Sequence, residues 1–328
     1  MDNIVVSICC IAYNAEKYIA QTLDSFLMQK CNFDYEILIH DDASTDNTAA
    51  IIREYEEKYP SIIHGVYQTE NQYSKGVRIS ITYLYPKAKG KYIALCEGDD
   101  FWTDSNKLQM QVDALENNPC CHMCVHKVKG IYDDLTPVGK YYPNFHLNSG
   151  IISSRDFVNY NCTNDYIFQT SSYFMLAKDI MDYKDNYPKF ARVSATGDLA
   201  HMLYFATKGD IYYIADEMSC YRQGSTSSKC RIEKYTNTEQ KIQKHFNKQI
   251  EMMREYDIYT DGEYHKFCER KINGYLFDKA MRNNEFREVI RLKYRFYFRK
   301  YSFKFRIKSY LYVLFPRLIS VYNKGKVN

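Results

Sequence analysis

The chain has 328 residues, a hydrophobic fraction of 45%, a charged fraction of 26% and a formal net charge of +4. With 13 Gly and 7 Pro, this composition excludes collagen, an extended coiled coil and a largely disordered chain. No run of about 18 apolar residues is present, so no segment is predicted to cross a bilayer as a helix. The N-terminus lacks the basic start of a signal peptide, and 11 scattered cysteines fit reduced thiols, so we expect a cytoplasmic protein.

Charge is divided unevenly along the chain. Residues 231–328 hold 23 basic and 11 acidic residues, whereas the first 230 residues hold 21 basic and 29 acidic ones. After Glu288 there are 11 basic residues and no acidic residue. We therefore predict an acidic body over residues 1–228 and a basic, helical C-terminal region over 229–328.

The first half of the chain alternates between predicted strands and helices. The predicted strands cover residues 4–12, 35–40, 62–68, 91–96 and 123–128, and the predicted helices cover 14–27, 45–58 and 107–117. Asn14 is expected to cap the first of these helices. Strands separated by helices of this length indicate βαβ units and a mostly parallel sheet, which binds ligands at the carboxyl ends of its strands.

The second half is less regular. Residues 129–165 are rich in Tyr, Asn and Gly, and we expect a long, partly ordered loop there. Two further strands, near 171–176 and 211–215, enclose a helix near 198–207. Predicted helices over 232–256, 263–282 and 285–301 complete the chain.

Two acidic turns follow predicted strands. One is EGDD at 97–100, and the other begins with Asp41 and Asp42. Carboxylates suit Mg²⁺ or Mn²⁺, whose remaining ligands are water and substrate phosphates. Each turn alone is also typical of a solvated loop or a helix start. Because both follow strands at the same edge of the predicted sheet, where the strand 4–12 also ends, together they predict one site.

The first 117 residues resemble the inverting family 2 glycosyltransferases with the GT-A fold. The matching segments, in order, are VSICCIAYNAEKYIAQTLDSFLMQ, YEILIHDDASTDNTAAIIREYEEKYP, ENQ and KGKYIALCEGDDFWTDSNKLQMQVDALENNP. The resemblance continues weakly to about residue 228. It implies an α/β fold with a Rossmann-like, nucleotide-binding mixed sheet flanked by helices, a nucleotide-sugar donor, and Mn²⁺ or Mg²⁺ as cofactor.

The resemblance also implies positions that contact the nucleotide. They are Ile11, Ala12 and Tyr13 at the base and ribose, Asp42 at the base, Glu97 and Asp99 at the ribose and diphosphate, and Arg222 at the diphosphate. Asp100 is expected to bind the metal ion directly, with Asp99 beside it. Uracil N3–H suits Asp42, but thymine presents the same group, so a UDP-sugar is expected and a dTDP-sugar stays open. Lys75 or Arg78 is expected near the base, where the family has an Arg-Asn segment.

Transfer with inversion needs a base that takes the proton of the acceptor hydroxyl. The resemblance places this base at the start of a helix, where Asp198 follows Gly197; an ordinary helix-capping aspartate is the alternative. The segment Thr170–Ser172 resembles the lining of the sugar and acceptor pocket, or is a strand with alternating polar residues. His201 lies one turn after Asp198 and is expected either to orient Asp198 or simply to pack on a face of the same helix.

The basic tail interleaves Lys and Arg with Tyr, Phe, Leu and Ile in RLKYRFYFRKYSFKFRIKSYLYVLFP. This pattern predicts a peripheral contact with an anionic membrane surface, or a helix pair packed on the body. Nucleic acid is not expected as a partner.

The expected function is a metal-dependent inverting glycosyltransferase of surface polysaccharide synthesis. It would move a sugar from a UDP-sugar to a glycan or polyprenyl-linked glycan. A nucleotidyltransferase is a weaker alternative, because no basic Gly-rich phosphate loop follows the first strand. A non-catalytic nucleotide-sugar-binding or scaffold protein is another, and it would be favoured if Asp198 pointed away from the donor pocket.

Overall fold

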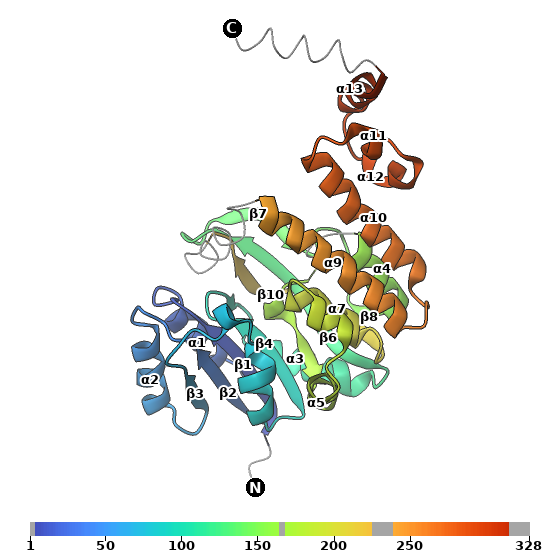
Figure 1. The fold of residues 1–328 in the computed structure, drawn as a ribbon. Coiled ribbons are helices and arrows are strands. Elements are labelled where there is room, and N and C mark those ends of the chain that lie inside the picture. The colour runs from blue at the N-terminus through green and yellow to red at the C-terminus, as the bar shows by residue number, and fades with distance from the viewer. Residues whose placement is uncertain (1–3, 164–167, 225–238, 315–328) are drawn as a thin grey trace.

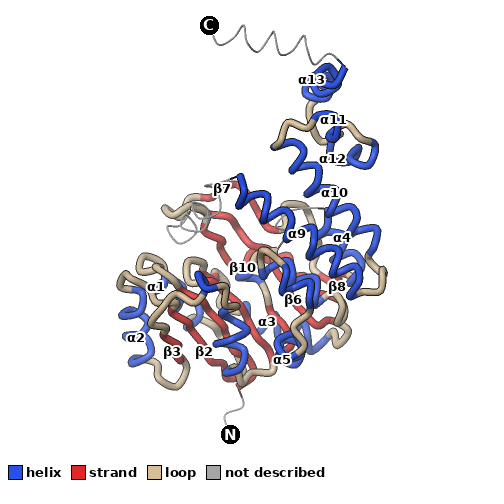
Figure 2. The backbone as a smooth tube through the Cα atoms, in the orientation of Figure 1, coloured by secondary structure: helices blue, strands red, loops and turns tan. Residues whose placement is uncertain are grey.

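The computed structural model describes residues 4–163, 168–224 and 239–314. One mixed sheet contains the strands β1 (Ile4–Ala12), β2 (Asp34–Asp41), β3 (Ile63–Tyr67), β4 (Tyr92–Glu97), β5 (Phe101–Trp102), β6 (Cys121–Ile131), β7 (Pro137–Tyr142), β8 (Gly150–Ile152), β9 (Phe174–Leu176) and β10 (Asp210–Arg222). Figure 2 shows the strands as a layer with helices around it.

The helices of the body are α1 (Ile19–Leu27), α2 (Thr48–Lys58), α3 (Lys107–Asn117), α4 (Ser154–Thr163), α5 (Ala177–Asp185), α6 (Lys189–Val193) and α7 (Gly197–Phe205). Those of the C-terminal region are α9 (Glu239–Tyr259), α10 (His265–Arg282), α11 (Phe286–Val289), α12 (Arg295–Phe298) and α13 (Phe303–Leu314). The α/β architecture with a helical C-terminal region confirms the predicted fold class (Figure 1).

The strand order places three strand ends side by side. Adjacent strands follow the order β3-β2-β1-β4-β9-β6-β10-β5. β1 runs parallel to β2 and β4, so that Ala12 pairs with Asp41 and Ile11 pairs with Glu97. The carboxyl ends of β1, β2 and β4 therefore meet at one edge, as the sequence predicts. Beyond β4 the sheet is mixed, because β9 runs antiparallel to both β4 and β6.

The strand β1 forms the centre of the core because its apolar side chains alternate between the two faces of the sheet. Ile8 and Cys10 belong to a cluster with residues of α1, α2 and α3. Cys9 points into the opposite cluster, which contains residues of α4, α5, α7, α9 and α10. All three are at most 3% exposed, so the continuous apolar run is that of a strand covered on both faces.

A fully buried lysine packs against Trp102 of β5, the strand that follows the acidic turn. Lys107, at the start of α3, donates from Nζ to Gln111 Oε1 at 2.7 Å and lies 3.8 Å from the Trp102 ring centroid. Burial lowers the pKa of Lys107 to about 7, although the nearby Cys96 and Cys124 thiols act in the opposite direction. The cation–π contact and the hydrogen bond both favour the charged form of this side chain.

The start of the first helix differs from the prediction. α1 begins at Ile19, and Asn14 lies in the preceding turn with a positive φ of 49°. Its N–H donates to Ser44 Oγ at 2.9 Å, and its Oδ1 accepts from the Thr45 N–H at 2.8 Å. Asn14 thus joins the turns after β1 and β2, because asparagine tolerates the left-handed region better than most residues.

The segment expected to be a loop, residues 129–165, is largely ordered. β6 continues to Ile131, and β7 pairs antiparallel with it through Val128 and Tyr142. β8 and α4 follow, and α5, for which no element was predicted, comes after β9. The strands β7 and β8 are short and partly exposed, and β8 pairs with the distant β10, so local periodicity gave little signal for them.

The C-terminal region has two parts. Ile250, Met253 and Tyr256 of α9 belong to the same core cluster as Met123 of β6, so α9 packs on the body. After α10, a small separate cluster holds α11 and α12 (Figure 1). The predicted helix over 285–301 is thus wrong as a single element, and α13 was not predicted. No helix among the described residues is long and apolar enough to span a membrane. The domain division at residue 228 stays a prediction.

Candidate active site

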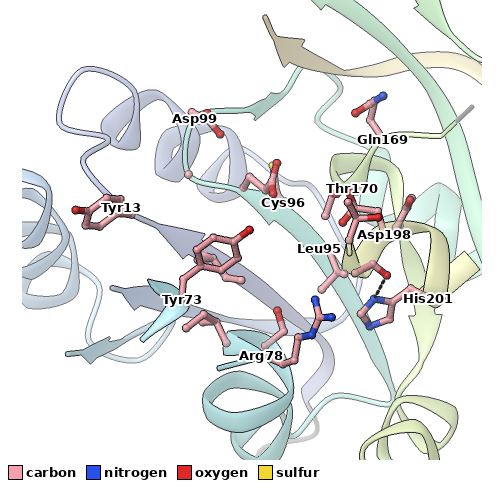
Figure 3. Close-up of a pocket in the computed structure, with 18 of the residues that line it drawn as sticks. Tyr13, Tyr73, Arg78, Leu95, Cys96, Asp99, Gln169, Thr170, Asp198 and His201 are labelled. Carbon is pink, nitrogen blue, oxygen red and sulfur yellow. Dashed lines mark hydrogen bonds between the residues drawn. The ribbon is translucent and has the colours of Figure 1, made fainter. Parts of the chain in front are cut away.

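A pocket of about 1300 Å³ lies where β1, β2 and β4 end. Seven of the predicted site residues line it: Ile11, Ala12, Tyr13, Asp42, Glu97, Asp99 and Asp198. Figure 3 shows Tyr13 and Tyr73 on one side of this pocket and Asp198, Thr170 and His201 on the other. The structure therefore brings together side chains that are up to 187 positions apart in the sequence.

Asp42 is almost completely buried at the end of β2. Its Oδ1 accepts from the Gln72 N–H at 2.8 Å, and its Oδ2 accepts from the Tyr73 N–H at 3.0 Å. The carboxylate thus fixes the turn that carries Tyr73 into the pocket. Each carboxylate oxygen has a second acceptor site, so the side chain has capacity for a further donor.

The acidic turn after β4 separates its carboxylates. Glu97 and Asp99 line the pocket, whereas Asp100 does not and is 2% exposed. Asp100 Oδ1 accepts from the Arg222 N–H at 2.8 Å, and Thr22 Oγ1 of α1 donates to the Asp100 carbonyl at 2.7 Å. Burial, and then the charges of Asp99 and Glu97, raise the pKa of Asp100 well above its usual range. The expectation that Asp100 is the direct metal ligand is therefore not supported by its position.

Arg222 also differs from its predicted place. It is 3% exposed and does not line the pocket. Its guanidinium donates to the Asp99 carbonyl at 2.9 Å and to Gln21 Oε1 at 2.8 Å, and it lies 4.7 Å from the ring centroid of Tyr18. Because the donors point at main chain and an amide, Arg222 holds the acidic turn against α1, and a direct diphosphate contact does not fit this arrangement.

Asp198 lies in the first turn of α7, whose N-terminal end favours a negative charge. The side chain is exposed and lines the pocket beside Thr170 (Figure 3). Its position at a helix start agrees with the sequence prediction. The arrangement that would have favoured a non-catalytic protein, an Asp198 outside the pocket, is not found.

His201 supports the first turn of α7. Its Nδ1–H donates to the Gly197 carbonyl at 3.2 Å, and its Nε2 accepts from the Tyr85 hydroxyl at 3.2 Å. Burial lowers the pKa of His201 to about 4, against the effect of the Asp198 charge, so the ring is neutral near pH 7. Both nitrogens are used by partners other than Asp198, which makes His201 a support of the helix start.

Of the two alternatives Lys75 and Arg78, Arg78 lines the pocket and donates to the Ser194 carbonyl at 2.9 Å, just before α7, while Lys75 pairs with Glu70 outside the pocket. Sequence reasoning missed most of the remaining lining. The missed positions include many aromatic or basic residues: Tyr73, Tyr141, Tyr142, Tyr173, Tyr183, Tyr187, Tyr221, His245, Phe246, Lys140 and Arg282. The high tyrosine count, 33 of 328 residues, was the one available signal for an aromatic cleft.

The lining suits a divalent metal only in part. Glu97 and Asp99 supply hard carboxylate oxygens at one turn. Their negative charges add to the effect of burial in raising the pKa of Asp100, which is the behaviour of an electronegative turn. Among residues 4–163, 168–224 and 239–314, however, no group of three or more His, Cys, Asp or Glu could hold a metal ion. The donor set fits an ion that takes its other ligands from a bound diphosphate and water.

The sequence matches known proteins over much of its length. The profile described as Glycosyl transferase family 2 matches residues 7–175. The uncharacterized protein Rv1520 of Mycobacterium tuberculosis is 33% identical over 221 residues, which are 66% of this chain and 58% of that protein. The Escherichia coli UDP-Glc:alpha-D-GlcNAc-diphosphoundecaprenol beta-1,3-glucosyltransferase WfgD is 33% identical over 118 residues, 36% of this chain and 44% of WfgD.

The fold also matches solved structures. S. aureus TarS 1-349 in complex with UDP-GlcNAc superposes with a TM-score of 0.62 at 17% identity, covering 89% of this chain and 78% of TarS 1-349. At this identity the similarity concerns the fold. The chain spans 58% of the length of Rv1520 and 44% of that of WfgD. Since the family profile covers more than half of the chain, this protein belongs to glycosyl transferase family 2 and has the GT-A fold.

Proposed function

We propose that the protein is a metal-dependent inverting glycosyltransferase that moves a sugar from a UDP-sugar to a glycan or lipid-linked glycan in polysaccharide synthesis. The observation that carries this proposal is the single pocket that combines Tyr13 and Asp42 with Glu97, Asp99 and Asp198. The family, the name of WfgD and the UDP-GlcNAc bound to TarS agree with a UDP-sugar donor.

The nucleotide would lie along the ends of β1, β2 and β4. Ile11, Ala12 and Tyr13 would border the base and ribose, and Asp42 would accept the N3–H of uracil. Glu97 would face the ribose. Asp42 is already fixed by two main-chain N–H groups, so its carboxylate is held in place before the base arrives.

Mn²⁺ or Mg²⁺ would be held by Asp99, with Glu97 beside it. Bound there, the ion would neutralise charge on the departing nucleoside diphosphate. Asp100 and Arg222 act behind the turn, because their hydrogen bonds fix the main chain from which Asp99 projects. We therefore revise the direct ligand from Asp100 to Asp99.

Asp198 would act as the general base. As an acceptor hydroxyl oxygen attacks the anomeric carbon, the bond between that carbon and the phosphate oxygen breaks and Asp198 takes the hydroxyl proton. The nucleoside diphosphate leaves from the face opposite the attack, which inverts the anomeric configuration. An exposed carboxylate at the N-terminal turn of a helix is accessible to such an acceptor.

The test measures release of nucleoside diphosphate from a panel of sugar nucleotides, with Mn²⁺, with Mg²⁺ and with chelator. We expect release with UDP-sugars that stops in chelator, and a loss of about 10²- to 10⁴-fold in Asp198→Asn. UDP binding should be unchanged in this variant. Turnover that persists in chelator would overturn the metal role, and wild-type turnover of Asp198→Asn would overturn the assignment of the base.

We also propose that α11, α12 and α13 contact an anionic membrane surface. Apolar side chains are widely exposed there, with Leu292 at 84%, Phe303 at 71% and Leu314 at 66%. Exposed lysines and arginines lie between them, and the last acidic residue, Glu288, already pairs with Arg291. Interfacial binding of this kind gains about 1 kcal/mol per basic residue near the surface.

Liposome flotation tests this contact. Truncation at residue 288 would also remove the buried Tyr294 and Phe298 from their cluster, so charge reversal at the exposed Arg299, Lys300 and Lys304 is the cleaner change. We expect flotation that increases with the content of anionic lipid, decreases with salt and is lost in the triple charge reversal. Equal flotation of this variant and the wild type would contradict the proposal.

A further inference from the structure

The pocket has an outer wall that the donor-binding residues do not explain. β7 contributes Lys140 and Tyr142, the end of β10 contributes Tyr221, α9 contributes Phe246 and α10 contributes Arg282. At about 1300 Å³ the pocket exceeds the range of about 300 to 1,000 Å³ that is usual for a single small ligand. A second ligand therefore has room beside the donor.

The pocket is lined by charges of both signs. Its carboxylates, Asp42, Glu97, Asp99 and Asp198, come from the strand ends and the start of α7. Arg78 lies beside α7 and already donates to the Ser194 carbonyl, whereas Lys140 and Arg282 stand on the outer wall. Both basic residues are exposed. Within the part of the chain that the structure describes, the side chain of neither residue donates a hydrogen bond or forms an ion pair, and the guanidinium of Arg282 lies 5.9 Å from the ring centroid of Phe246.

Two tyrosines connect the acidic turn to this wall. Tyr142 and Tyr221 meet edge to face with ring centroids 5.7 Å apart, and Gln223 Nε2 donates to the Tyr142 hydroxyl at 2.6 Å. Burial raises the pKa of both phenols. Tyr221 directly precedes Arg222, whose N–H donates to Asp100 Oδ1 at 2.8 Å, so the pair adjoins the acidic turn, and Lys140 is two residues from Tyr142 on β7.

We propose that this wall is the acceptor subsite and that Lys140 and Arg282 bind the phosphate or diphosphate through which the acceptor sugar is joined to its carrier. The inference rests on the proposed function, since an acceptor is needed only if the protein transfers a sugar. Arginine binds phosphate through its planar fork of donors and lysine binds it as a point charge. The acceptor sugar lies against Tyr142 and Tyr221, between its phosphate and the reacting centre.

The neighbouring elements fit a carrier that is a lipid. Arg282 is the last residue of α10, and the chain continues from it into α11, α12 and α13, which project beyond the body (Figure 1). Those helices follow Arg282 directly in the chain and carry exposed apolar and basic side chains. An acceptor held in a bilayer would place its phosphate at the surface, at the level of such helices.

The test measures the binding of two probes, inorganic pyrophosphate and decyl diphosphate, to the full-length protein by titration calorimetry. The protein is first saturated with UDP and Mg²⁺, so that the donor diphosphate position is filled. We expect both probes to bind the wild type and to bind Lys140→Met/Arg282→Met at least about tenfold more weakly, which equals about 1.4 kcal/mol. UDP affinity should be the same in both proteins.

A matched control is Lys244→Met/Lys266→Met, which removes the same charge from exposed positions on α9 and α10 that do not line the pocket. It should bind both probes as the wild type does. Tighter binding of decyl diphosphate indicates a lipid-linked acceptor, and equal binding indicates a water-soluble one. The subsite is refuted if the UDP-loaded wild type binds neither probe, or if the two double variants weaken binding equally. Failure of UDP itself to bind would count against the proposed function instead.

Discussion

Replacing Arg222 by methionine removes a buried guanidinium from the turn that carries the pocket carboxylates. The side chain donates to the Asp99 carbonyl at 2.9 Å, to Gln21 Oε1 at 2.8 Å and to the Asp133 carbonyl at 3.3 Å. It also supplies positive charge beside the buried Asp100. Methionine fills a similar volume, but it leaves the three oxygen acceptors without a donor and the Asp100 carboxyl without a neighbouring positive charge.

The expected loss of stability follows from these contacts. Hydrogen bonds from a charged donor contribute about 1.5 to 3 kcal/mol each, and removing one partner from a buried charge pair costs about 3 to 5 kcal/mol. We expect the free energy of unfolding of Arg222→Met to fall by about 3 to 5 kcal/mol, because the contacts are not additive. Arg222→Lys should lose roughly 2 kcal/mol, since it keeps the charge but not the fork of donors.

Urea unfolding followed by circular dichroism measures this loss, and UDP titration measures donor affinity. Arg254→Met, at an exposed position on α9, is the matched control and should unfold as the wild type does within about 0.5 kcal/mol. A direct diphosphate ligand predicts the reverse pattern. If Arg222→Met unfolds like the wild type but binds UDP at least tenfold more weakly, the structural role is wrong and the role expected from the sequence is right.

Three further predictions concern the metal ligand, the buried Lys107 and the close approach of Gly90 to β1. Asp99→Asn should raise the Mn²⁺ concentration that gives half-maximal turnover by at least about tenfold. Asp100→Asn should have a smaller effect, because the amide oxygen of Asn still accepts from the Arg222 N–H that holds the turn; a larger effect of Asp100→Asn than of Asp99→Asn would restore Asp100 as the ligand. Lys107, whose pKa is about 7 when folded, binds fewer protons in the folded than in the unfolded state between about pH 7 and 10.5, so its contribution to stability should rise with pH there. The difference in unfolding free energy between wild type and Lys107→Met should therefore grow by several kcal/mol over this range, and a constant difference would contradict the burial argument. Gly90→Ala should destabilise by more than about 3 kcal/mol in thermal unfolding, because a Cβ there would lie 2.5 Å from the main-chain nitrogen of Ser7 in β1. Gly197→Ala, whose Cβ would lie 4.0 Å from its nearest neighbour, the Arg78 guanidinium, should change stability by less than about 1 kcal/mol. Equal effects would show that the main chain of β1 moves to accommodate the added methyl group.

The elements with strong apolar periodicity could be predicted from the sequence. β1 and α3 occupy the predicted residues 4–12 and 107–117, because each has a buried face that the apolar positions mark. β10 was predicted only over 211–215, although the strand continues to Arg222. The continuation passes Asp216 and Glu217, where the register with β6 shifts, so the alternation that marks a strand is interrupted.

The site could be predicted in outline but not in detail. Strand ends and an acidic turn locate the carboxylates, yet spacing alone does not tell which of Asp99 and Asp100 faces the pocket. That choice depends on Arg222 and Thr22, which reach the turn from β10 and α1. The outer wall was missed for the same reason. Lys140 and Arg282 become neighbours of the pocket only through the packing of distant elements, which no local pattern records.

The residues that line the pocket come from many segments between Cys9 and Arg282. The residues proposed to bind the donor and those proposed to bind the acceptor can therefore change independently of one another. The residues proposed for the donor lie before residue 100, and those proposed for the acceptor carrier lie on β7 and at the end of α10. A chimaera that receives β7, α9 and α10 from a relative should therefore acquire a new acceptor preference while keeping its nucleotide. A fragment that ends at residue 175, where the family profile ends, would keep the residues proposed to bind the nucleotide but would lack Asp198. Divergence confined to these late segments would let one donor-binding scaffold serve many different glycans.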